Sequence, residues 1–441
     1  MVDVASNSKR IRGLRMCLAF VALTGACGGG AGSPTAPPSP AASSEFMFGL
    51  SQVDGRTASL ASELGVRWLR PAVRWTDVEP VLAQPSLTVA DVKTNPSLVE
   101  QYSRSVNWAA PDALLSSLSS AGLRAFVIVG HGYSGRLPRW NGVAATPDAI
   151  GRELYLGHLY LHVRAVVERY DGDGQLDAPG ITPVRHWQLE NELNEAYLTA
   201  LWGWREPSFE QAHASAWQDW DFLTRLLTTL ADAVKGSDAS ALTAVNFHTD
   251  VSDALSATLG KRTWRQAIQQ WSGLIDIVGI DAYPNYYRAQ PPRGSVLGDR
   301  VSAARQLGGG RPVIVLETGY PSGPAIEGFD EASQDAYIRA AYASALSAGA
   351  SGYFHYGSLT AESHQVEITA ADLENLERVG AAYEGEDVGW LITFSLTQPD
   401  YLRGHFVSVL QAVEGYWGLV RADGSRKPSW STVQELARNR P

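Results

Sequence analysis

The chain has 441 residues, with 36 Lys and Arg against 46 Asp and Glu and a formal net charge of −10. This acidic balance argues against nucleic acid or an anionic membrane surface as the main partner. With 45% hydrophobic and 19% charged residues, the composition is that of an ordinary soluble globular protein, long enough for one large domain or two ordinary ones.

Residues 1–26 predict an export signal that is removed from the mature protein. A basic stretch, KRIRGLR, precedes a short apolar run, MCLAFVALTGA, which is too short for a stable membrane span. Together with Cys27, this leader resembles a bacterial lipoprotein signal, although Thr24 stands three places before the cysteine, where an aliphatic residue is usual. The resemblance implies that Cys27 is lipidated, and simple secretion is the alternative. In both cases we expect export, with membrane contact only through the lipid.

The segment that follows the leader, residues 27–44, is rich in Gly, Pro and Ser and predicts a flexible tether. Cys17 and Cys27 are the only cysteines, so the mature chain has no pair for an intramolecular disulfide. We expect residues 45–441 to fold as one domain and to be monomeric.

From residue 45 onward, short apolar runs alternate with longer amphipathic stretches. Most of the runs are continuously apolar, which is typical of parallel strands that are buried on both faces. The predicted strands are residues 46–50, 66–70, 124–130, 184–190, 242–247, 275–281, 312–317 and 351–357. Helical spacing predicts helices at residues 147–170, at 330–350 with a stop at Gly349, and at 427–439.

Eight strands separated by helical intervals favour a (β/α)₈ TIM barrel. A doubly wound sheet is disfavoured because no Gly-rich phosphate-binding turn follows the first strand. In TIM barrels the active site lies at the C-terminal ends of the strands. Polar and aromatic side chains gather at these ends, namely Arg70, His131, Asn191, Glu192, His248, Tyr283, Glu317, His355 and Tyr356.

Three strand-end motifs together resemble clan A glycoside hydrolases. They are ENE (190–192), DAYP (281–284) and LETGYPSG (316–323). The third is similar to the nucleophile segment of family 17 β-1,3-glucanases and family 53 β-galactanases, whereas the first is closer to other families of the clan that carry an Asn-Glu pair. The resemblance covers the chain from residue 45 to the C-terminus and leaves the family open.

The resemblance implies that Glu192 is the general acid/base and Glu317 the nucleophile of a retaining enzyme. Asn191 would bind the sugar 2-hydroxyl, and Arg70 and Tyr283 would hold Glu317. Glycoside cleavage requires one protonated carboxylic acid for the leaving oxygen and one ionised carboxylate for the anomeric carbon. Taken alone, Glu192 is as readily explained as a helix-capping carboxylate, and Tyr283 as a core residue.

Other strand-end residues are candidates for binding sugar. His131 and His248 have the chemistry of hydrogen-bonding subsite residues, and ordinary buried histidines are the alternative. No tryptophan ends the eighth strand, so His355 or Tyr356 is expected to replace the one that usually floors the cleavage subsite. Trp202 and Trp204 follow the fourth strand and are candidates for a sugar platform, with core packing as the alternative.

The sequence YDGDGQLDAPG places Asp171, Asp173 and Asp177 at the spacing that opens a calcium-binding loop. Leu176 and Thr182 stand where the usual Gly and Glu would be, so a solvated Asp/Gly turn is the alternative. No H-E-x-x-H, C-x-x-C or phosphate-loop motif is present. The sequence therefore predicts no cofactor and favours the solvated turn, with a structural calcium at this loop as the alternative.

These observations predict an exported retaining β-glycoside hydrolase. We expect an endo-acting glycanase whose partner is a β-linked oligo- or polysaccharide of plant, fungal or microbial origin. The alternative is a catalytically silent carbohydrate-binding barrel that is tethered to the cell surface. The presence of both Glu192 and Glu317 argues against the silent barrel.

Overall fold

The computed structural model describes residues 45–51, 57–82, 86–130, 137–198, 215–258, 260–285, 289–323, 325, 328–357 and 415–441. The leader, the tether with Cys27, and three of the proposed binding residues (His131, Trp202 and Trp204) lie outside the described residues, so the predictions made for them stay predictions. Within the described ranges, no helix is both long and apolar enough to cross a membrane.

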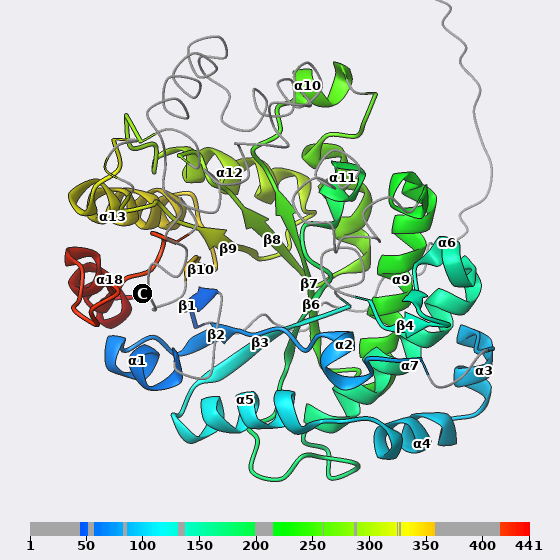
Figure 1. Ribbon diagram of the computed structural model, residues 1–441. Coiled ribbons are helices and arrows are strands. Elements are labelled where there is room, and N and C mark those ends of the chain that lie inside the picture. The colour runs from blue at the N-terminus through cyan, green and yellow to red at the C-terminus, as the bar shows by residue number, and fades with distance from the viewer. Residues whose placement is uncertain are drawn as a thin grey trace, which may run out of the picture. The chain divides into compact units, whose positions relative to one another are not determined.

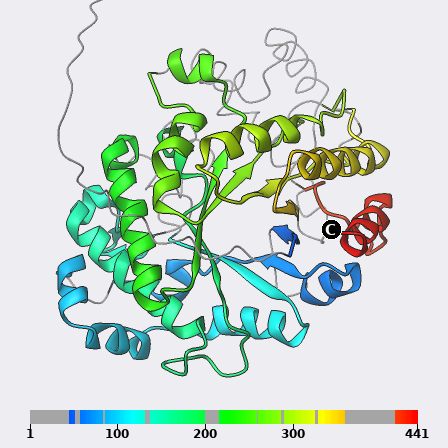
Figure 2. The same cartoon turned by 180° about the vertical axis from the view of Figure 1, so that it is seen from behind.

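The described residues form a closed barrel of parallel strands surrounded by helices (Figures 1 and 2). The strands are β1 (Met47–Ser51), β2 (Trp68–Arg70), β3 (Arg124–Val129), β6 (His186–Leu189), β7 (Leu242–His248), β8 (Ile277–Asp281), β9 (Val313–Thr318) and β10 (Gly352–His355). They follow one another around the barrel in chain order, and β10 closes it against β1. Each of the eight predicted runs corresponds to one of these strands, so the predicted TIM barrel is confirmed.

Helices fill most of the intervals between the strands. They are α1 (Thr57–Leu64), α2 (Trp75–Val78), α3 (Val89–Thr94), α4 (Ser97–Ser105), α5 (Ala109–Ser120), α6 (Pro147–Ile150), α7 (Arg152–Tyr170), α9 (Trp220–Ser237), α10 (Asp253–Thr258), α11 (Trp264–Trp271), α12 (Val296–Leu307), α13 (Glu331–Ser347) and α18 (Pro428–Arg438). Short 3₁₀ turns are η1 (Leu193–Leu198), η3 (Ser215–Gln218) and η4 (Ser272–Leu274), and β4 (Arg139–Trp140) pairs with β5 (Val143–Ala144).

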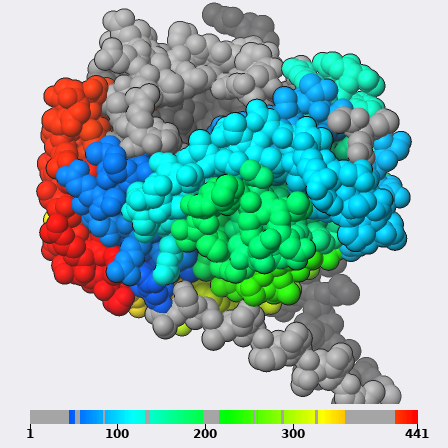
Figure 3. Space-filling model, turned by 90° about the horizontal axis from the view of Figure 1, so that it is seen from below, coloured from blue at the N-terminus to red at the C-terminus, as the bar shows by residue number. Residues whose placement is uncertain are grey.

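The C-terminal helix α18 completes the outer ring beside the first helix (Figure 3). Arg426, just before α18, forms an ion pair with Glu63 of α1, and Glu435 pairs with Arg339 of α13 at 2.8 Å. The segment 427–439 was predicted to be helical, and the structure confirms it. Because α18 contacts both the first and the last barrel helices, it joins the two ends of the barrel domain.

The helix predicted at residues 147–170 is in fact two helices. Thr146 caps α6, its hydroxyl accepting a 3.1 Å hydrogen bond from the Ala149 N–H. Gly151 then adopts a φ of +91°, a left-handed conformation that breaks the helix before α7 begins. By contrast, the predicted stop of α13 at Gly349 is confirmed, since Gly349 has a φ of +83° just after the helix ends.

The barrel interior consists of an apolar layer followed by a polar one. Its apolar cluster contains Met47, Trp68, Phe126, Ala244, Ile277, Ile314, Leu316 and Phe354, most of them early in their strands. Gly279 leaves room for this packing, because a Cβ there would lie 2.4 Å from the Leu316 Cδ1. Two residues beyond Trp68, Ala244 and Gly279, the inward side chains become Arg70, Asn246 and Asp281, and these begin the candidate site.

An irregularity in the pairing of β8 with β9 turns a carboxylate into the barrel. Ile280 pairs with Val315, but the next residue, Asp281, pairs with Glu317 and skips Leu316. A bulge of this kind lets two successive residues face the same side of a sheet. Leu316 therefore packs in the apolar cluster while Glu317 reaches the polar layer above it.

Candidate active site

Arg70, at the end of β2, is the central cation of the polar layer. Its Nε donates to Gln188 Oε1 at 2.6 Å, its Nη2 donates to Asn191 Oδ1 at 2.8 Å, and its Nη1 donates to Glu317. The side chain is buried, with 3% of the residue exposed. Burial opposes the charge, but Glu317 and Asp281 outweigh it and raise the pKa of Arg70 above its ordinary value. Arg70 therefore remains a fixed positive charge beside Glu317.

Glu317 is held from both sides of its carboxylate. Arg70 donates to Oε1, and the hydroxyl of Tyr283, which follows β8, donates to Oε2. Two donors to one buried carboxylate fix the orientation of both of its oxygens. The predicted contacts of Arg70 and Tyr283 with Glu317 are thus present in the structure.

Glu192 is presented by an unusual turn at the end of β6. Both Glu190 and Glu192 have positive φ values, +58° and +49°, which are uncommon outside glycine. The Glu192 N–H donates to Asn246 Oδ1 at 2.9 Å, and the Asn246 Nδ2 donates to Asn191 Oδ1 at 2.9 Å. Gln188 Nε2 donates to Asn246 Oδ1 at 2.7 Å. This amide network ties the turn to the neighbouring strand β7.

The carboxyl groups of Glu192 and Glu317 lie close together. One carboxylate oxygen of Glu192, one of Glu317 and one of Asp281 all lie within 4.8 Å of one another. Burial, followed by the charges of Glu317 and Glu195, raises the pKa of Glu192 to about 8, against the opposing effect of His248 and Arg70. Glu192 is therefore a protonated acid at neutral pH. Three carboxyls at this spacing also have the donor set of a cation site, but Arg70 already supplies a cation there.

Asp281 is a third acid that sequence analysis did not single out. It is fully buried on β8, and its Oδ2 accepts a 2.5 Å hydrogen bond from Asn246 Nδ2. Burial, with the charges of Glu317 and Glu192, raises the pKa of Asp281 well above its ordinary value. Burial beside Glu317 therefore favours the neutral form of Asp281. Its position in the DAYP motif, two residues before Tyr283, was the available signal.

Glu190, the first residue of ENE, takes no part in this group. It is fully buried, and its carboxylate lies against Gly130 at the end of β3. Burial and the charge of Glu190 together raise the pKa of Tyr155 on α7 well above its ordinary value. Of the two glutamates in ENE, only Glu192 meets Glu317.

The ring of His248 lies between two carboxylates. Its Nδ1 contacts a carboxylate oxygen of Glu195, and its Nε2 lies 3.3 Å from Asp250 Oδ2. Asn194 also bridges the His248 backbone, donating to its carbonyl at 3.0 Å and accepting from its N–H at 3.1 Å. Both ring nitrogens are occupied, so neither is left to bind a sugar hydroxyl. Glu195, Asn194 and Asp250 were not predicted from the sequence.

The two candidates at the end of β10, His355 and Tyr356, lie in different surroundings. His355 is fully buried, and burial lowers its pKa to about 4, so it is a neutral core histidine and does not join the carboxylates. Tyr356 does approach the site, with its ring 5.3 Å from that of Tyr283. Trp417 completes an edge-to-face cluster, 5.3 Å from Tyr283 and 5.5 Å from Tyr356. A tryptophan thus supports this side of the site, but it comes from the segment before α18 and is itself buried, with 1% of its surface exposed.

The Asp-rich loop between α7 and β6 differs from the predicted calcium set. Asp177 accepts backbone hydrogen bonds from Gly172 at 2.9 Å and Gly174 at 2.6 Å, as in a closed turn. Glu168, and not Asp177, lies near Asp171 and Asp173. One carboxylate oxygen of each of these three residues lies within 4.8 Å of the other two. The loop precedes β6 and therefore lies at the barrel end opposite to Glu192.

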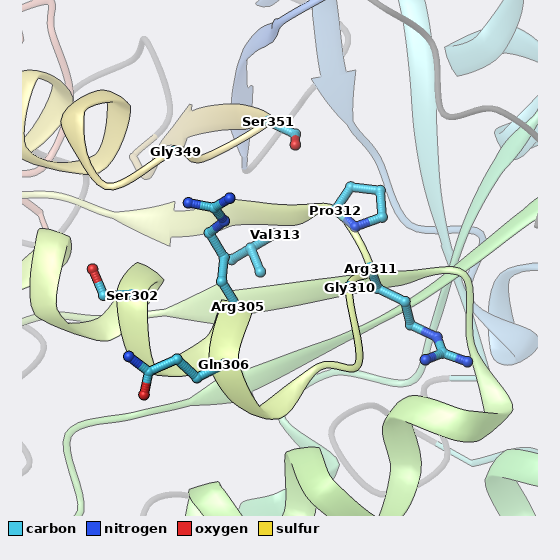
Figure 4. A pocket seen from close by; sticks show the side chains of 9 residues that line it. All are labelled: Ser302, Arg305, Gln306, Gly310, Arg311, Pro312, Val313, Gly349 and Ser351. Atoms are coloured by element: carbon cyan, nitrogen blue, oxygen red, sulfur yellow. The ribbon is translucent and has the colours of Figure 1, made fainter.

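A separate hollow of about 670 Å³ also lies at that opposite end (Figure 4). It is lined by Ser302, Arg305, Gln306, Gly310, Arg311, Pro312, Val313, Gly349 and Ser351. Arg305 donates to the Ala348 carbonyl at 2.9 Å, and Arg311 donates to that of Ile275 at 2.7 Å. These arginines satisfy carbonyls near the ends of α13 and η4, so we assign them a structural role.

Comparison with known proteins supports the fold. The sequence matches no family model and no curated protein. Among solved structures, the GH53 catalytic domain of Ignisphaera aggregans is similar over 91% of this chain and 98% of that domain, with 14% identity and a TM-score of 0.50. A family 39 glycoside hydrolase from Bacteroides cellulosilyticus WH2 is similar over 90% of this chain, with 15% identity and a TM-score of 0.48, and this chain spans 64% of that protein's length.

A glucosidase from Croceicoccus marinus is similar over 89% of this chain and 67% of its own length, with 14% identity and a TM-score of 0.48. At these identities the likeness shows the fold alone. The barrel that the clan A resemblance implied is therefore confirmed, and the activity must be argued from the site.

Proposed function

We propose that this protein is a retaining β-glycoside hydrolase in which Glu192 is the acid/base and Glu317 the nucleophile. The observation that carries the proposal is the pairing of a half-buried, protonated carboxyl with one held by Arg70, their oxygens within 4.8 Å. Retaining enzymes place the two carboxyls about 5–5.5 Å apart, whereas inverting enzymes need about 6.5–9.5 Å to fit a water between them.

The first chemical step uses the difference between the two carboxyls. Glu192 donates its proton to the glycosidic oxygen as the bond to the anomeric carbon breaks, and Glu317 attacks that carbon to form a glycosyl ester. The donors from Arg70 and Tyr283 orient Glu317 for attack. Asn191 is only half-buried and its Nδ2 donates to Glu192 Oε2 at 3.4 Å, which supports the proposed contact of its amide with a sugar hydroxyl.

The second step reverses the proton transfer. Glu192, now ionised, accepts a proton from water as the water attacks the anomeric carbon, and Glu317 leaves as a carboxylate. Because both displacements invert the anomeric carbon, the product keeps the β configuration. The negative charge moves from Glu317 to Glu192 and back, so the total charge near Arg70 is unchanged through the cycle.

For the substrate, we propose a β-linked oligo- or polysaccharide that is cut internally. A panel of such polysaccharides with a reducing-sugar assay tests this, and ¹H NMR of early products reports the anomer. We expect β product to appear first. An α product at early times would contradict the roles given to Glu192 and Glu317. Carbohydrate binding without hydrolysis on every member of the panel would favour the silent barrel.

For localisation, we propose that the barrel is exported and tethered through lipidated Cys27. Glu45, the first described residue, forms ion pairs with Arg67 at 2.9 Å and Arg124 at 3.1 Å, which lie at the starts of β2 and β3. The tether therefore joins the barrel end opposite to the carboxylates. With an r.m.s. reach of roughly 20–25 Å, it would keep the barrel close to the membrane surface.

A further inference from the structure

The segment that follows Glu192 is built around one histidine. Its 3₁₀ turn, η1, supplies Asn194 and Glu195, and both side chains reach His248 at the end of β7. Two residues after His248, Asp250 returns its carboxylate to the other side of the same ring. All three titratable groups are nearly buried, with 8%, 9% and 8% of His248, Glu195 and Asp250 exposed.

The contacts at the two ring nitrogens favour the doubly protonated form of the ring. A neutral imidazole carries one N–H, so one of the two flanking carboxylates would face a lone pair. An imidazolium donates at Nδ1 to Glu195 and at Nε2 to Asp250 and satisfies both. Asp250 is itself fixed, because its Oδ2 accepts the Tyr283 N–H at 2.6 Å.

We propose that Glu195 and Asp250 hold His248 as a permanent imidazolium and that this charge sets the pH at which Glu192 gives up its proton. The effect of His248 on Glu192 rests on the proposed function of Glu192 as the acid/base. His248 and Glu195 are then positioning residues, because they act through Glu192 and do not touch the substrate. The motif around the acid/base thus extends from ENE to ENELNE and to the His-x-Asp of β7.

The charges around His248 agree with this assignment. It faces Glu192 and Glu195 from the β6–η1 segment, Asp250 from its own strand end, and the Tyr283 ring at 6.4 Å from the end of β8. Arg300 of α12 acts on Asp250. Although burial opposes it, Glu195, Asp250 and Glu192 raise the pKa of His248 well above its ordinary value. In return, His248 lowers the pKa of Glu192, second only to the effect of burial.

The first test is ¹⁵N NMR of the imidazole nitrogens of the wild-type protein between about pH 5 and about pH 9, the range in which an ordinary histidine titrates. We expect both His248 nitrogens to stay protonated throughout, with the signals assigned from their loss in His248→Asn. In Glu195→Gln the ring should titrate within the range. His162 is the matched control, since burial lowers its pKa to about 3 and it should stay neutral. A wild-type His248 that titrates or is neutral would overturn the proposal.

The second test measures Glu192 directly by ¹³C NMR of its carboxyl in wild type and His248→Asn. Loss of the positive charge should raise the pKa of Glu192 by about one unit. The alkaline limb of kcat/KM should move to higher pH by the same amount. An unchanged or lowered Glu192 pKa would refute the electrostatic role. Both NMR measurements are independent of turnover, so an inactive protein would count against the proposed function while these results still decide the role of His248.

Discussion

The amide oxygen of Asn246 accepts a 2.9 Å hydrogen bond from the backbone N–H of Glu192, whose φ is +49°. Left-handed conformations of non-glycine residues cost about 1–3 kcal/mol and persist where the surroundings hold them. Asn246 lies on β7, whereas Glu192 follows β6, so pairing of the two strands holds the turn. The position of the acid/base carboxyl therefore depends on the closed barrel and not on its own segment alone.

The roles of the two glutamates can be separated with azide. Glu317→Ala removes the attacking group, so activity should fall by several orders of magnitude on every substrate. Glu192→Ala leaves the attack intact, so an activated aryl glycoside should form a glycosyl-enzyme that persists. Added azide needs no base and should restore turnover of Glu192→Ala with a β-glycosyl azide as product. With Glu317→Ala it should give the α-azide or no product.

Glu190→Gln is the control for these two variants, because Glu190 is buried beside them but lies outside the carboxylate group. It should keep activity within about tenfold of wild type, since it removes no interaction made in the transition state. A β-azide from Glu317→Ala and none from Glu192→Ala would show that the roles are reversed.

Arg70→Lys tests whether charge alone is enough to hold Glu317. Lysine keeps the charge but cannot donate at once to Gln188, Asn191 and Glu317, as the planar guanidinium does. We expect kcat/KM to fall by about 10²–10³-fold. Arg67→Lys is the matched control, because Arg67 lies three residues earlier and its side chain is 58% exposed. Equal activities for the two variants would contradict the role of Arg70.

The raised pKa of Glu192 predicts how stability depends on pH. Between its ordinary value of 4.5 and its folded value of about 8, the folded protein keeps a proton that the unfolded chain has lost. The contribution of Glu192 to the free energy of unfolding therefore falls as pH rises through this window. Glu192→Gln removes the effect, so its Tm relative to wild type should increase from pH 4.5 to pH 8. A Tm difference that does not vary with pH would count against a protonated Glu192.

The loop at Asp171 offers a test of the calcium expectation. Asp171 is 1% exposed, and burial raises its pKa from 3.8 to about 7, so its contribution to stability also falls as pH rises through that interval. Because Asp177 closes the turn through backbone N–H groups, we expect Asp171→Asn to raise the Tm above pH 7 and Ca²⁺ to leave it unchanged. A Ca²⁺-dependent rise of the wild-type Tm that is lost in Asp173→Asn would instead identify a calcium site.

The tether prediction is tested in cells by Cys27→Ser. If Cys27 is lipidated, the wild-type protein should sediment with membranes and the variant should be released into the soluble fraction. The activity per molecule should be unchanged, because residues 27–44 precede the barrel domain. A wild-type protein that is found wholly in the soluble fraction would favour simple secretion.

Most of the barrel could be predicted from the sequence, because a parallel strand buried on both faces requires a continuous apolar run. The ends of those runs identified Arg70, Glu192, Tyr283 and Glu317, since polar residues become tolerable where a strand leaves the core. The break at Gly151 was missed because the apolar spacing continues on both sides of it.

Only the tertiary structure decided which side chains meet. Asn246 and Asp281 are polar residues inside apolar strands, and nothing local shows that they face the barrel interior at the height of Arg70. The irregular pairing that turns Glu317 inward depends on the register of β8 and β9. The contact between Glu195 and His248 joins the turn after β6 to the end of the next strand, β7. Trp417, near the C-terminus, packs against Tyr283 at the end of β8. Such contacts depend on barrel closure, which brings distant residues together without any local pattern.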